Sequence, residues 1–410
     1  MMDSLVFKRK KTVTKFAMLM LALYPILDYY SALNTPLTYA GFIGIVLFIM
    51  SLGESGFKSF NKIPGFYYLY WAYAAFQIYY IAGVDGWSDY LPGGIYLVLF
   101  SLALIGIVYY FDYDLLLKYM KVVFVISSVV LLLQYILFFL LGTKMSFFLP
   151  LSSHLTYGSM SYSELVAHQT IQDRLASIFA EPSHFAQYTI ILLAAELFSS
   201  KNRYKLYTGF SLIIIGIIVL IQSGAGVLGV ILVYIIKVVY VIIVARKWSI
   251  IPVLLILIPI VFYSIQFLIG TEIGEYLTSR TGELSAANYE DNSGGSDRLF
   301  FGWFVYGEFD TFQKLLGTSR TYVWELTEFG FYNGITYVLC TQGLVGLLLL
   351  MMFYIFINRK QTIEAHSISI IFLGLSFISA TYLSGNMMIC TVIVLGLWNS
   401  IVKRMSQQRI

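Results

Sequence analysis

The stretch Val122–Leu141 reads VVFVISSVVLLLQYILFFLL and contains no charged residue, no glycine and no proline. A helix needs about 20 apolar residues to cross the hydrocarbon core of a membrane. A spanning chain must also satisfy its backbone hydrogen bonds internally, which leaves helices and closed barrels. The unbroken apolar run lacks the alternation of a barrel strand. We therefore expect a membrane-spanning helix over about 119–141.

The rest of the 410-residue chain repeats this pattern, with 59% hydrophobic and 12% charged residues. So little charge excludes a disordered protein, a soluble enzyme and a nucleic-acid binder. The chain has room for about twelve spans. We predict an all-α, polytopic integral membrane protein that forms a single domain over 1–410. The spans are expected at about 16–33, 37–52, 63–82, 91–111, 119–141, 182–199, 205–221, 225–244, 249–268, 335–357, 367–383 and 387–402.

Basic residues are concentrated in every second connection, and these connections lie on one side of the arrangement. The two terminal segments and the even-numbered connections together carry 19 of the 26 lysines and arginines. Cytoplasmic loops of membrane proteins are enriched in Lys and Arg. The pattern therefore supports twelve spans with both termini in the cytoplasm. A basic start followed by an apolar run without a small-residue cleavage site predicts an uncleaved first span.

Two outer segments are long, about 142–181 and about 269–334, the latter between spans 9 and 10. Long loops often carry function, and we expect short helices in the second. Its arginines Arg280, Arg298 and Arg320 stand out against ten acidic residues. Arginine suits phosphate oxygens because its planar fork donates two parallel hydrogen bonds. The alternative is a solvated loop whose arginines pair with its own acids.

An aromatic run, Leu299–Phe304, follows Arg298 in this loop. Its mixed apolar character would suit a helix lying on the membrane surface. The aromatic rings could stack on sugars and cover a polyprenyl chain. The alternative is a loop that merely rests on lipid, and aromatic content does not separate the two.

The stretch Arg174–Tyr188 reads RLASIFAEPSHFAQY and is the most informative one. Pro182 suits the first turn of a helix, which places Arg174 and Glu181 at the outer membrane surface. Ser183 and His184 then fall in the first turn of the sixth span. A carboxylate, a histidine and an arginine there could do acid–base work beside a bound anion. The alternative is structural, because an acid near a helix N-terminus is stabilised by the helix dipole.

Charges inside the predicted spans need a separate explanation. Asp28, Glu196 and Lys237 are such residues, and membrane-embedded charge is costly. Ion coupling is one reading of Lys237, but snorkelling or an intramembrane pair is favoured. The four histidines show no metal-ligand spacing, and Cys340 and Cys390 both lie in apolar runs. The sequence therefore predicts neither a metal site nor a cofactor.

Two motifs resemble those of a known superfamily. Arg174–Tyr188 resembles the R-x-x-x-x-F-x-E-P-S-x-F-A-x-Y pattern of Wzy-type bacterial polysaccharide polymerases. Tyr332-Asn333 with Gly343-x-x-Gly346 resembles the H-N-x9-G-x-x-G signature of O-antigen ligases and polymerases, at the same place after the large outer loop. The chain has Tyr332 where ligases have histidine, which favours a polymerase over a ligase.

The resemblance implies a metal-independent, GT-C-like glycosyltransferase of the bacterial cytoplasmic membrane. It would join oligosaccharide repeat units linked to undecaprenyl diphosphate on the outer face, for O-antigen, capsule or exopolysaccharide. Implied partners are these lipid-linked glycans, the bilayer, a flippase and chain-length regulators, but no nucleic acid. Rival readings are a ligase, a lipid-linked oligosaccharide flippase or other transporter, and a non-enzymatic scaffold.

The resemblance also suggests a role for each candidate residue. A diphosphate clamp would consist of Arg174, Arg298 and Arg320, with Arg280 a weaker candidate. Glu181 would be the base or the carboxylate that orients the acceptor, with His184 as runner-up. Tyr332 and Asn333 would line the sugar site, and Ser183 would contribute to substrate binding.

Overall fold

A computed structural model describes residues 2–30, 32, 37–84, 87–142, 175–244, 246, 297–318, 333–359, 361–379 and 381–407. Side chains are described for the same residues except 2–10, 78–94, 297–298 and 404–407. Helices form nearly all of this part of the chain, and it contains no strand. The prediction of an all-α protein is confirmed for these residues.

The bounds of the helices are α1 (Met2–Leu27), α2 (Tyr39–Ser55), η1 (Gly56–Lys62), α3 (Gly65–Val84), α4 (Trp87–Tyr109), α5 (Tyr113–Leu141), α7 (Pro182–Phe198), α8 (Gly209–Ile221), α9 (Gly224–Ile243), η3 (Asp297–Phe301), α12 (Gly302–Glu308), α13 (Thr311–Leu316), α15 (Gly334–Asn358), α16 (Ile363–Ile378) and α17 (Gly385–Gln407). Helices that are distant in the chain pack side by side, such as α2 with α4, α3 with α15 and α1 with α5.

Five helical segments in the described residues are long and apolar enough to cross a membrane. They are Tyr39–Lys62, Tyr113–Leu141, Gly224–Ile243, Gly334–Asn358 and Gly385–Lys403. The Val122–Leu141 stretch lies within the second of these, as predicted. Helices also occupy the other predicted spans except 249–268, which lies outside the described residues. These helices fit a membrane protein with several crossings, while the number twelve stays a prediction.

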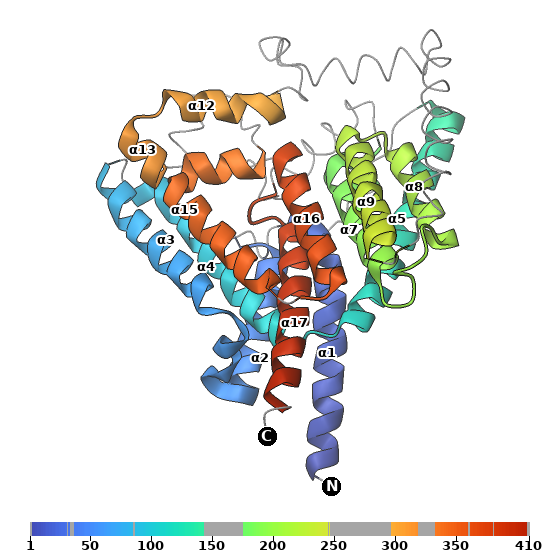
Figure 1. Cartoon of the computed structure of the whole chain (residues 1–410), viewed down its shortest axis with the longest axis horizontal. Coiled ribbons are helices and arrows are strands. Elements are labelled where there is room, and N and C mark those ends of the chain that lie inside the picture. Colours follow the sequence, from blue (N-terminus) through green and yellow to red (C-terminus); the bar gives the residue numbers. More distant parts are fainter. Residues whose placement is uncertain are drawn as a thin grey trace.

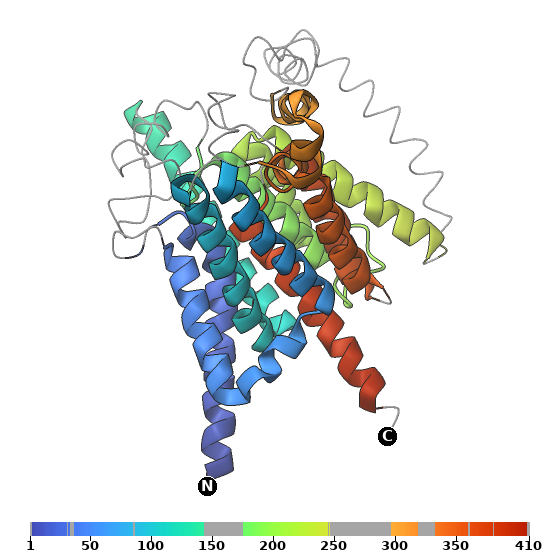
Figure 2. The same cartoon turned by 90° about the vertical axis from the view of Figure 1, so that its left-hand side faces the viewer.

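The helices form a bundle with two distinct ends (Figure 1). α1 begins and α17 ends at one end, which we call the terminal end. α12 lies at the opposite end, which we call the loop end, and the perpendicular view in Figure 2 shows the same separation. α7 occupies the interior, because every one of its residues is buried. It contacts α5, α8, α9, α16 and α17, as expected for a helix that is apolar on all sides.

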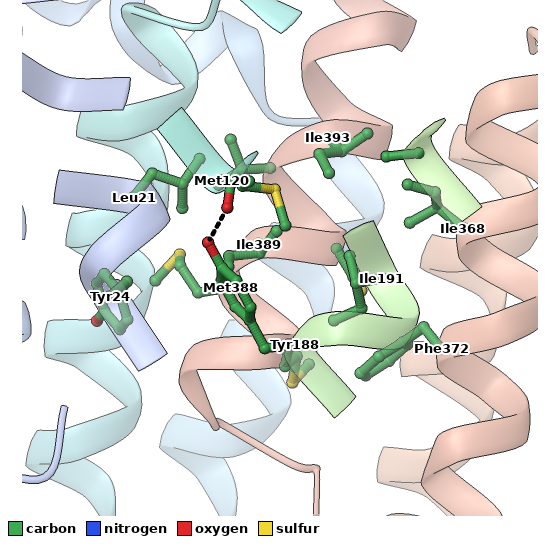
Figure 3. Close-up of a cluster of buried hydrophobic side chains, with 14 of the residues drawn as sticks. Leu21, Tyr24, Met120, Tyr188, Ile191, Ile368, Phe372, Met388, Ile389 and Ile393 are labelled. Carbon is green, nitrogen blue, oxygen red and sulfur yellow. Dashed lines mark hydrogen bonds between the residues drawn. The ribbon is translucent and has the colours of Figure 1, made fainter. Parts of the chain in front are cut away.

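Figure 3 shows part of the core around α7, with labelled side chains from α1, α5, α7, α16 and α17. Tyr188 of α7 is completely buried and donates a hydrogen bond of 3.3 Å to the carbonyl oxygen of Met120 in α5. Phe372 of α16 and Met388 of α17 lie near it in the same cluster. Because buried polar groups need partners, the Tyr188 hydroxyl fixes α7 relative to α5 within an otherwise apolar environment.

α15 is a broken helix. At Gly343 its backbone leaves helical geometry, with φ 65° and ψ −177°. The carbonyl oxygens freed by the break are satisfied from α3, since Tyr73 Oη donates to Gln342 O at 2.7 Å and Gln77 Nε2 donates to Thr341 O. Non-helical backbone at membrane depth is tolerated only where protein groups satisfy it in this way.

A second glycine, Gly317, packs against the break in α15. Gly317, which follows α13, has φ 80°, and a Cβ placed there would lie 2.5 Å from Gln342 N. A Cβ on Gly343 would in turn lie 2.2 Å from Leu315 O. The backbone N–H of Thr318 donates to Cys340 O at 2.9 Å. The two glycines therefore let the backbones of α13 and α15 interlock, which anchors this part of the predicted outer loop.

Two buried charges, Lys237 and Glu196, lie toward the terminal end. Lys237 of α9 is fully buried, and its Nζ donates to the carbonyl oxygens of Leu197, Asn202 and Arg203. Among the described residues its ammonium therefore binds backbone carbonyls at the end of α7 instead of the carboxylate expected for an ion pair. A cation is favourable at a helix C-terminus. Glu196 pairs with Lys121 at 2.6 Å.

Candidate functional site

The sequence-predicted motif occupies the start of α7, at the loop end. Pro182 is the first helical residue, and Glu181 precedes it with extended backbone, at φ −136° and ψ 152°. The predicted placement of Ser183 and His184 in the first turn is confirmed. Proline fixes the start because its missing N–H would have no helical partner there and its ring disfavours helical backbone in the preceding residue.

Glu181 does not cap the helix with its side chain. It holds the N-cap position but makes no side-chain hydrogen bond to the following backbone N–H groups. Instead, Glu181 Oε2 accepts a hydrogen bond of 2.9 Å from Ser183 Oγ. The structural alternative, in which the helix dipole stabilises the acid, stays open because Glu181 lies at the start of α7. The carboxylate and the hydroxyl form a pair at the positive end of the α7 dipole.

His184 is held by an aromatic ring from the end of α1. Its imidazole lies 5.1 Å from the Tyr29 ring, centroid to centroid, with an interplanar angle of 28°. Both His184 and Ser183 are 8% exposed, which leaves each with a small accessible edge. A stacked ring restricts how the imidazole can rotate, so one face of His184 is fixed against α1.

The side chain of Gln134 binds the backbone of the segment that leads into α7 and holds it in place. Ser177 N–H donates to Gln134 Oε1 at 2.9 Å, and Gln134 Nε2 donates to Ser177 O at 3.5 Å. Ser177 adopts a positive φ of 58°, and its hydroxyl donates to Ser127 O at 2.6 Å. Gln134 lies seven residues before the end of α5, or about 10 Å along the helix. The segment before Glu181 is therefore recessed below the end of α5.

Aromatic packing supports the same segment. Phe179 is fully buried and stacks on Phe185 of α7, with 4.9 Å between ring centroids and 13° between planes. Tyr188 lies 5.5 Å from Phe179. These three aromatic positions belong to the motif identified in the sequence, and they pack the chain on both sides of Glu181. The motif thus has a structural part, the aromatic residues, and a polar part that they position.

A polar network joins α7 to the turn between α16 and α17. Gln187, one turn after Ser183, donates through Nε2 to Ser379 Oγ at 2.6 Å and accepts at Oε1 from Asn386 Nδ2 at 3.1 Å. Ser379 O accepts the backbone N–H of Gly334 at 2.8 Å. Gln187, Ser379 and Asn386 are buried, and the groups named here have partners, whereas Asn386 Oδ1 has none among the described residues. The starts of α7, α15 and α17 are consequently held together.

Asp28 belongs to the same end of the bundle. Its Oδ1 accepts from Tyr96 Oη at 2.9 Å and from Thr38 Oγ1 at 3.1 Å. The backbone N–H of Gly385, the first residue of α17, also donates to this carboxylate. The residue that the sequence marked as an unexplained membrane charge therefore holds the α17 N-terminus, and its neighbour Tyr29 contacts His184.

Asn333 has a structural role at the start of α15. Its Oδ1 accepts the backbone N–H of Thr336 at 2.8 Å, as an N-cap. The side chain is 1% exposed, and Nδ2 donates to Leu299 O at 3.5 Å. The latter bond ties the beginning of α15 to η3. The Gly343-x-x-Gly346 part of the same motif coincides with the helix break, and its lining of a sugar site stays a prediction.

The remaining predicted residues cannot be placed beside this cluster. Arg174, Arg280, Arg320 and Tyr332 lie outside the described residues. Arg298 lies in η3, where the backbone alone is described. In the described part of the chain, no group of three or more His, Cys, Asp or Glu residues is arranged to hold a metal ion.

Sequence reasoning missed Gln134, Tyr29, Gln187, Ser379 and Asn386. Most of them are uncharged polar residues inside or beside apolar runs, a usable signal because a lone amide in a spanning helix needs a partner. Gln134 is the only amide in Val122–Leu141. Tyr29 gives no such signal, since the chain contains 33 tyrosines.

The cluster has the chemical elements of an acid–base site. Glu181, Ser183 and His184 supply a carboxylate, a hydroxyl and an imidazole at one recessed helix start. The adjacent helix N-terminus favours a negatively charged group. Such a set can orient a hydroxyl, accept its proton and stand beside an anionic leaving group. No family model matches the chain, and neither a curated protein nor a solved structure matches it.

Proposed function

We propose that the protein is a polysaccharide polymerase that joins lipid-diphosphate-linked oligosaccharides at the loop end of the bundle. The observation that carries the proposal is the set Glu181, Ser183 and His184 on the first turn of a helix buried along its whole length. Polar groups at a membrane-embedded position are costly and usually functional. The loop end would face outward, opposite the basic terminal segments.

The proposed reaction is a glycosyl transfer. A hydroxyl oxygen of the acceptor sugar forms a bond to the anomeric carbon of the donor glycan. The bond from that carbon to the lipid diphosphate oxygen breaks, and the lipid diphosphate leaves with the electron pair. Glu181 takes the acceptor proton or orients the acceptor hydroxyl, with His184 as the alternative base. Arg174, Arg298 and Arg320 neutralise the diphosphate, whose charge grows in the transition state.

The proposal includes the membrane arrangement predicted from the sequence. The chain would cross the bacterial cytoplasmic membrane about twelve times, with both termini in the cytoplasm. The segments 142–181 and 269–334 would lie outside and contribute the arginine clamp. The interlock of α13 with the α15 break supports this reading, because it fixes part of the second segment to the bundle.

The test replaces Glu181 and compares polymer length in cells that lack the native gene. Glu181→Gln removes the base while retaining the size of the side chain, so polymer formation should fall by about 10²–10⁴-fold. Glu308→Gln is the control, because Glu308 is an exposed carboxylate on α12 at the same end. Both variants should reach the membrane in equal amounts. Polymer of normal length from Glu181→Gln would refute the assignment of this residue.

The location of the repeat units separates the rival functions. Loss of a polymerase leaves single repeat units displayed outside the cell. Loss of a flippase traps them inside, and loss of a ligase leaves long polymer that is unattached. Arg174→Ala and Arg298→Ala should give the polymerase result, and normal polymer in both would count against the diphosphate clamp.

A further inference from the structure

A hollow of about 530 Å³ lies between α1 and α5, which pack against each other (Figure 1). Its volume falls within the range of about 300–1,000 Å³ that is usual for small-molecule sites. The hollow is at the terminal end of the bundle, opposite the cluster at the start of α7. It is lined by Lys11, Thr14 and Lys15 of α1 and by Asp112, Asp114, Leu115 and Lys118 at the start of α5.

Positive charge is in excess in this hollow, because three lysines and two aspartates line it. Lys11 and Lys15 are four residues apart on one face of α1, and like charges at this spacing repel each other. In the described part of the chain, none of the three lysines forms a salt bridge with a carboxylate. An anion between them would remove the repulsion.

The two carboxylates have their own place at the start of α5. Asp112 is the N-cap residue, and its Oδ1 accepts the backbone N–H of Leu115 at 3.0 Å. Asp114 lies in the first turn, where the helix dipole stabilises an acid. Because a carboxylate has two oxygens and about four acceptor positions, both residues can still accept hydrogen bonds from hydroxyl groups of a ligand.

Exposed apolar side chains begin directly beside the charged lining. Phe16, which follows Lys15, is 43% exposed, and Val122, one turn after Lys118, is 46% exposed. An exposed apolar surface on a helix as long and apolar as α5 faces acyl chains. The hollow therefore lies where headgroups meet hydrocarbon, and a ligand can place its charge at the lysines and its apolar chains along α5.

We propose that the α1–α5 hollow binds one anionic phospholipid whose headgroup carries hydroxyl groups, with phosphatidylglycerol as the simplest example. The lysines contact the phosphodiester through charge-assisted hydrogen bonds. The headgroup hydroxyls donate to Asp112 and Asp114. The single negative charge of this lipid equals the excess positive charge of the lining, whereas a zwitterionic lipid would leave that charge uncompensated.

The bound lipid would join two helices that both reach the candidate site. Tyr29, just after α1, stacks on His184, and Gln134 of α5 binds the backbone of Ser177. A headgroup held by lysines of both helices would therefore stabilise the α1–α5 pair from the opposite end of the bundle. This inference goes beyond the proposed function and does not depend on it.

The experiment measures lipid binding to the full-length protein in a neutral detergent by native mass spectrometry. The probe is phosphatidylglycerol, compared with phosphatidylethanolamine and phosphatidylcholine that carry the same acyl chains. Lys11→Ala combined with Lys15→Ala is the test variant, because both lysines are exposed and line the hollow. Lys201→Ala combined with Lys205→Ala is the matched control, since these exposed lysines have the same spacing but lie after α7, outside the hollow.

The native protein should bind its first phosphatidylglycerol molecule about tenfold more tightly than its first molecule of either zwitterionic lipid. The Lys11/Lys15 variant should lose this preference, and the Lys201/Lys205 variant should keep it. In phosphatidylcholine both variants should melt with the native protein, which would exclude misfolding as the cause. A preference that survives in the Lys11/Lys15 variant, or that both variants lose equally, would overturn the proposal.

Two further ligands test the source and the headgroup. Glycerol phosphate carries a phosphate and hydroxyl groups without acyl chains, so at millimolar concentration it should not displace phosphatidylglycerol. Displacement would identify a site for a soluble phosphate compound and overturn the lipid assignment. Phosphatidylmethanol has the same charge as phosphatidylglycerol but no headgroup hydroxyl, and it should bind more weakly. Equal affinity for these two lipids would overturn the roles given to Asp112 and Asp114.

Discussion

The interlock between Gly317 and Gly343 leads to a sharp prediction for Gly343→Ala. The alanine Cβ would lie 2.2 Å from Leu315 O and 2.5 Å from Gly317 N. Contacts this short with backbone atoms cannot be relieved by rotating a side chain. The backbone at Gly343, with φ 65° and ψ −177°, is also one that only glycine adopts readily.

Two costs add in this substitution. An unfavourable backbone conformation costs about 1–3 kcal/mol, and overpacking costs about 1–3 kcal/mol more. We expect Gly343→Ala to lose about 2–6 kcal/mol, or to relieve the strain by moving α13 away from α15. Movement of α13 would break the bond from Thr318 N–H to Cys340 O and release Leu316 O from Tyr73 and Gln77.

The assay combines thermal unfolding at one heating rate with limited trypsin digestion of the full-length protein in nanodiscs. Gly216→Ala is the control, because Gly216 lies in α8 with nothing within 4 Å of the added Cβ. Alanine there should be neutral or stabilising by up to about 1 kcal/mol. Gly343→Ala should melt well below the control, or be cut faster after Lys314 on α13. Equal melting and equal digestion of the two variants would refute the interlock.

Two further substitutions test the polar contacts. Lys237→Met should lower the apparent melting temperature, because the buried Leu197 carbonyl loses its donor at a cost of about 1–3 kcal/mol. The control is Ile235→Met, at a lipid-facing position on the same helix. Equal melting of the two variants would contradict the capping role of Lys237. Asp28→Ala should destabilise more than Asp28→Asn, because asparagine retains one acceptor oxygen for Tyr96 and Thr38. Indistinguishable melting curves for the two Asp28 variants would show that these hydrogen bonds do not hold the α17 N-terminus.

The buried helix α7 shows how one motif can serve fold and site together. Its aromatic residues Phe179, Phe185 and Tyr188 pack the interior. The polar residues Glu181 and Ser183 lie between them in sequence but at the helix start in space. Substitution of the aromatic positions should therefore affect folding, whereas substitution of the polar ones should affect function at constant protein level.

Much of the fold could be predicted from local sequence alone. The Val122–Leu141 run contains only residues that can face lipid or a neighbouring helix. A helix satisfies the backbone hydrogen bonds of such a run within the segment itself, so the sequence predicts a helix there. Pro182 fixed the start of α7 to the residue, because proline carries no N–H and restricts the backbone before it. These signals act within one or two turns of the chain, which is why they can be read without tertiary contacts.

Other features depend on residues far apart in sequence. The break in α15 at Gly343 requires acceptors on α15 to meet Tyr73 and Gln77 of α3. The sequence marked Gly343 as part of a motif but gave no reason for a break within an apolar run. Only the packing of α13 against α15 explains why glycine is needed at both Gly317 and Gly343.

The amino-acid sequence by itself determined that the described part of the chain is helical, with segments long and apolar enough to cross a membrane, and where α7 and its polar first turn begin. Helix formation, apolar length and the effect of proline are local properties of the chain. Only the tertiary structure decided that α7 lies at the centre, that Gln134 clamps the segment before it and that Lys237 binds backbone carbonyls. A buried amide or ammonium takes whatever partner the packing places within reach, and that partner is distant in sequence.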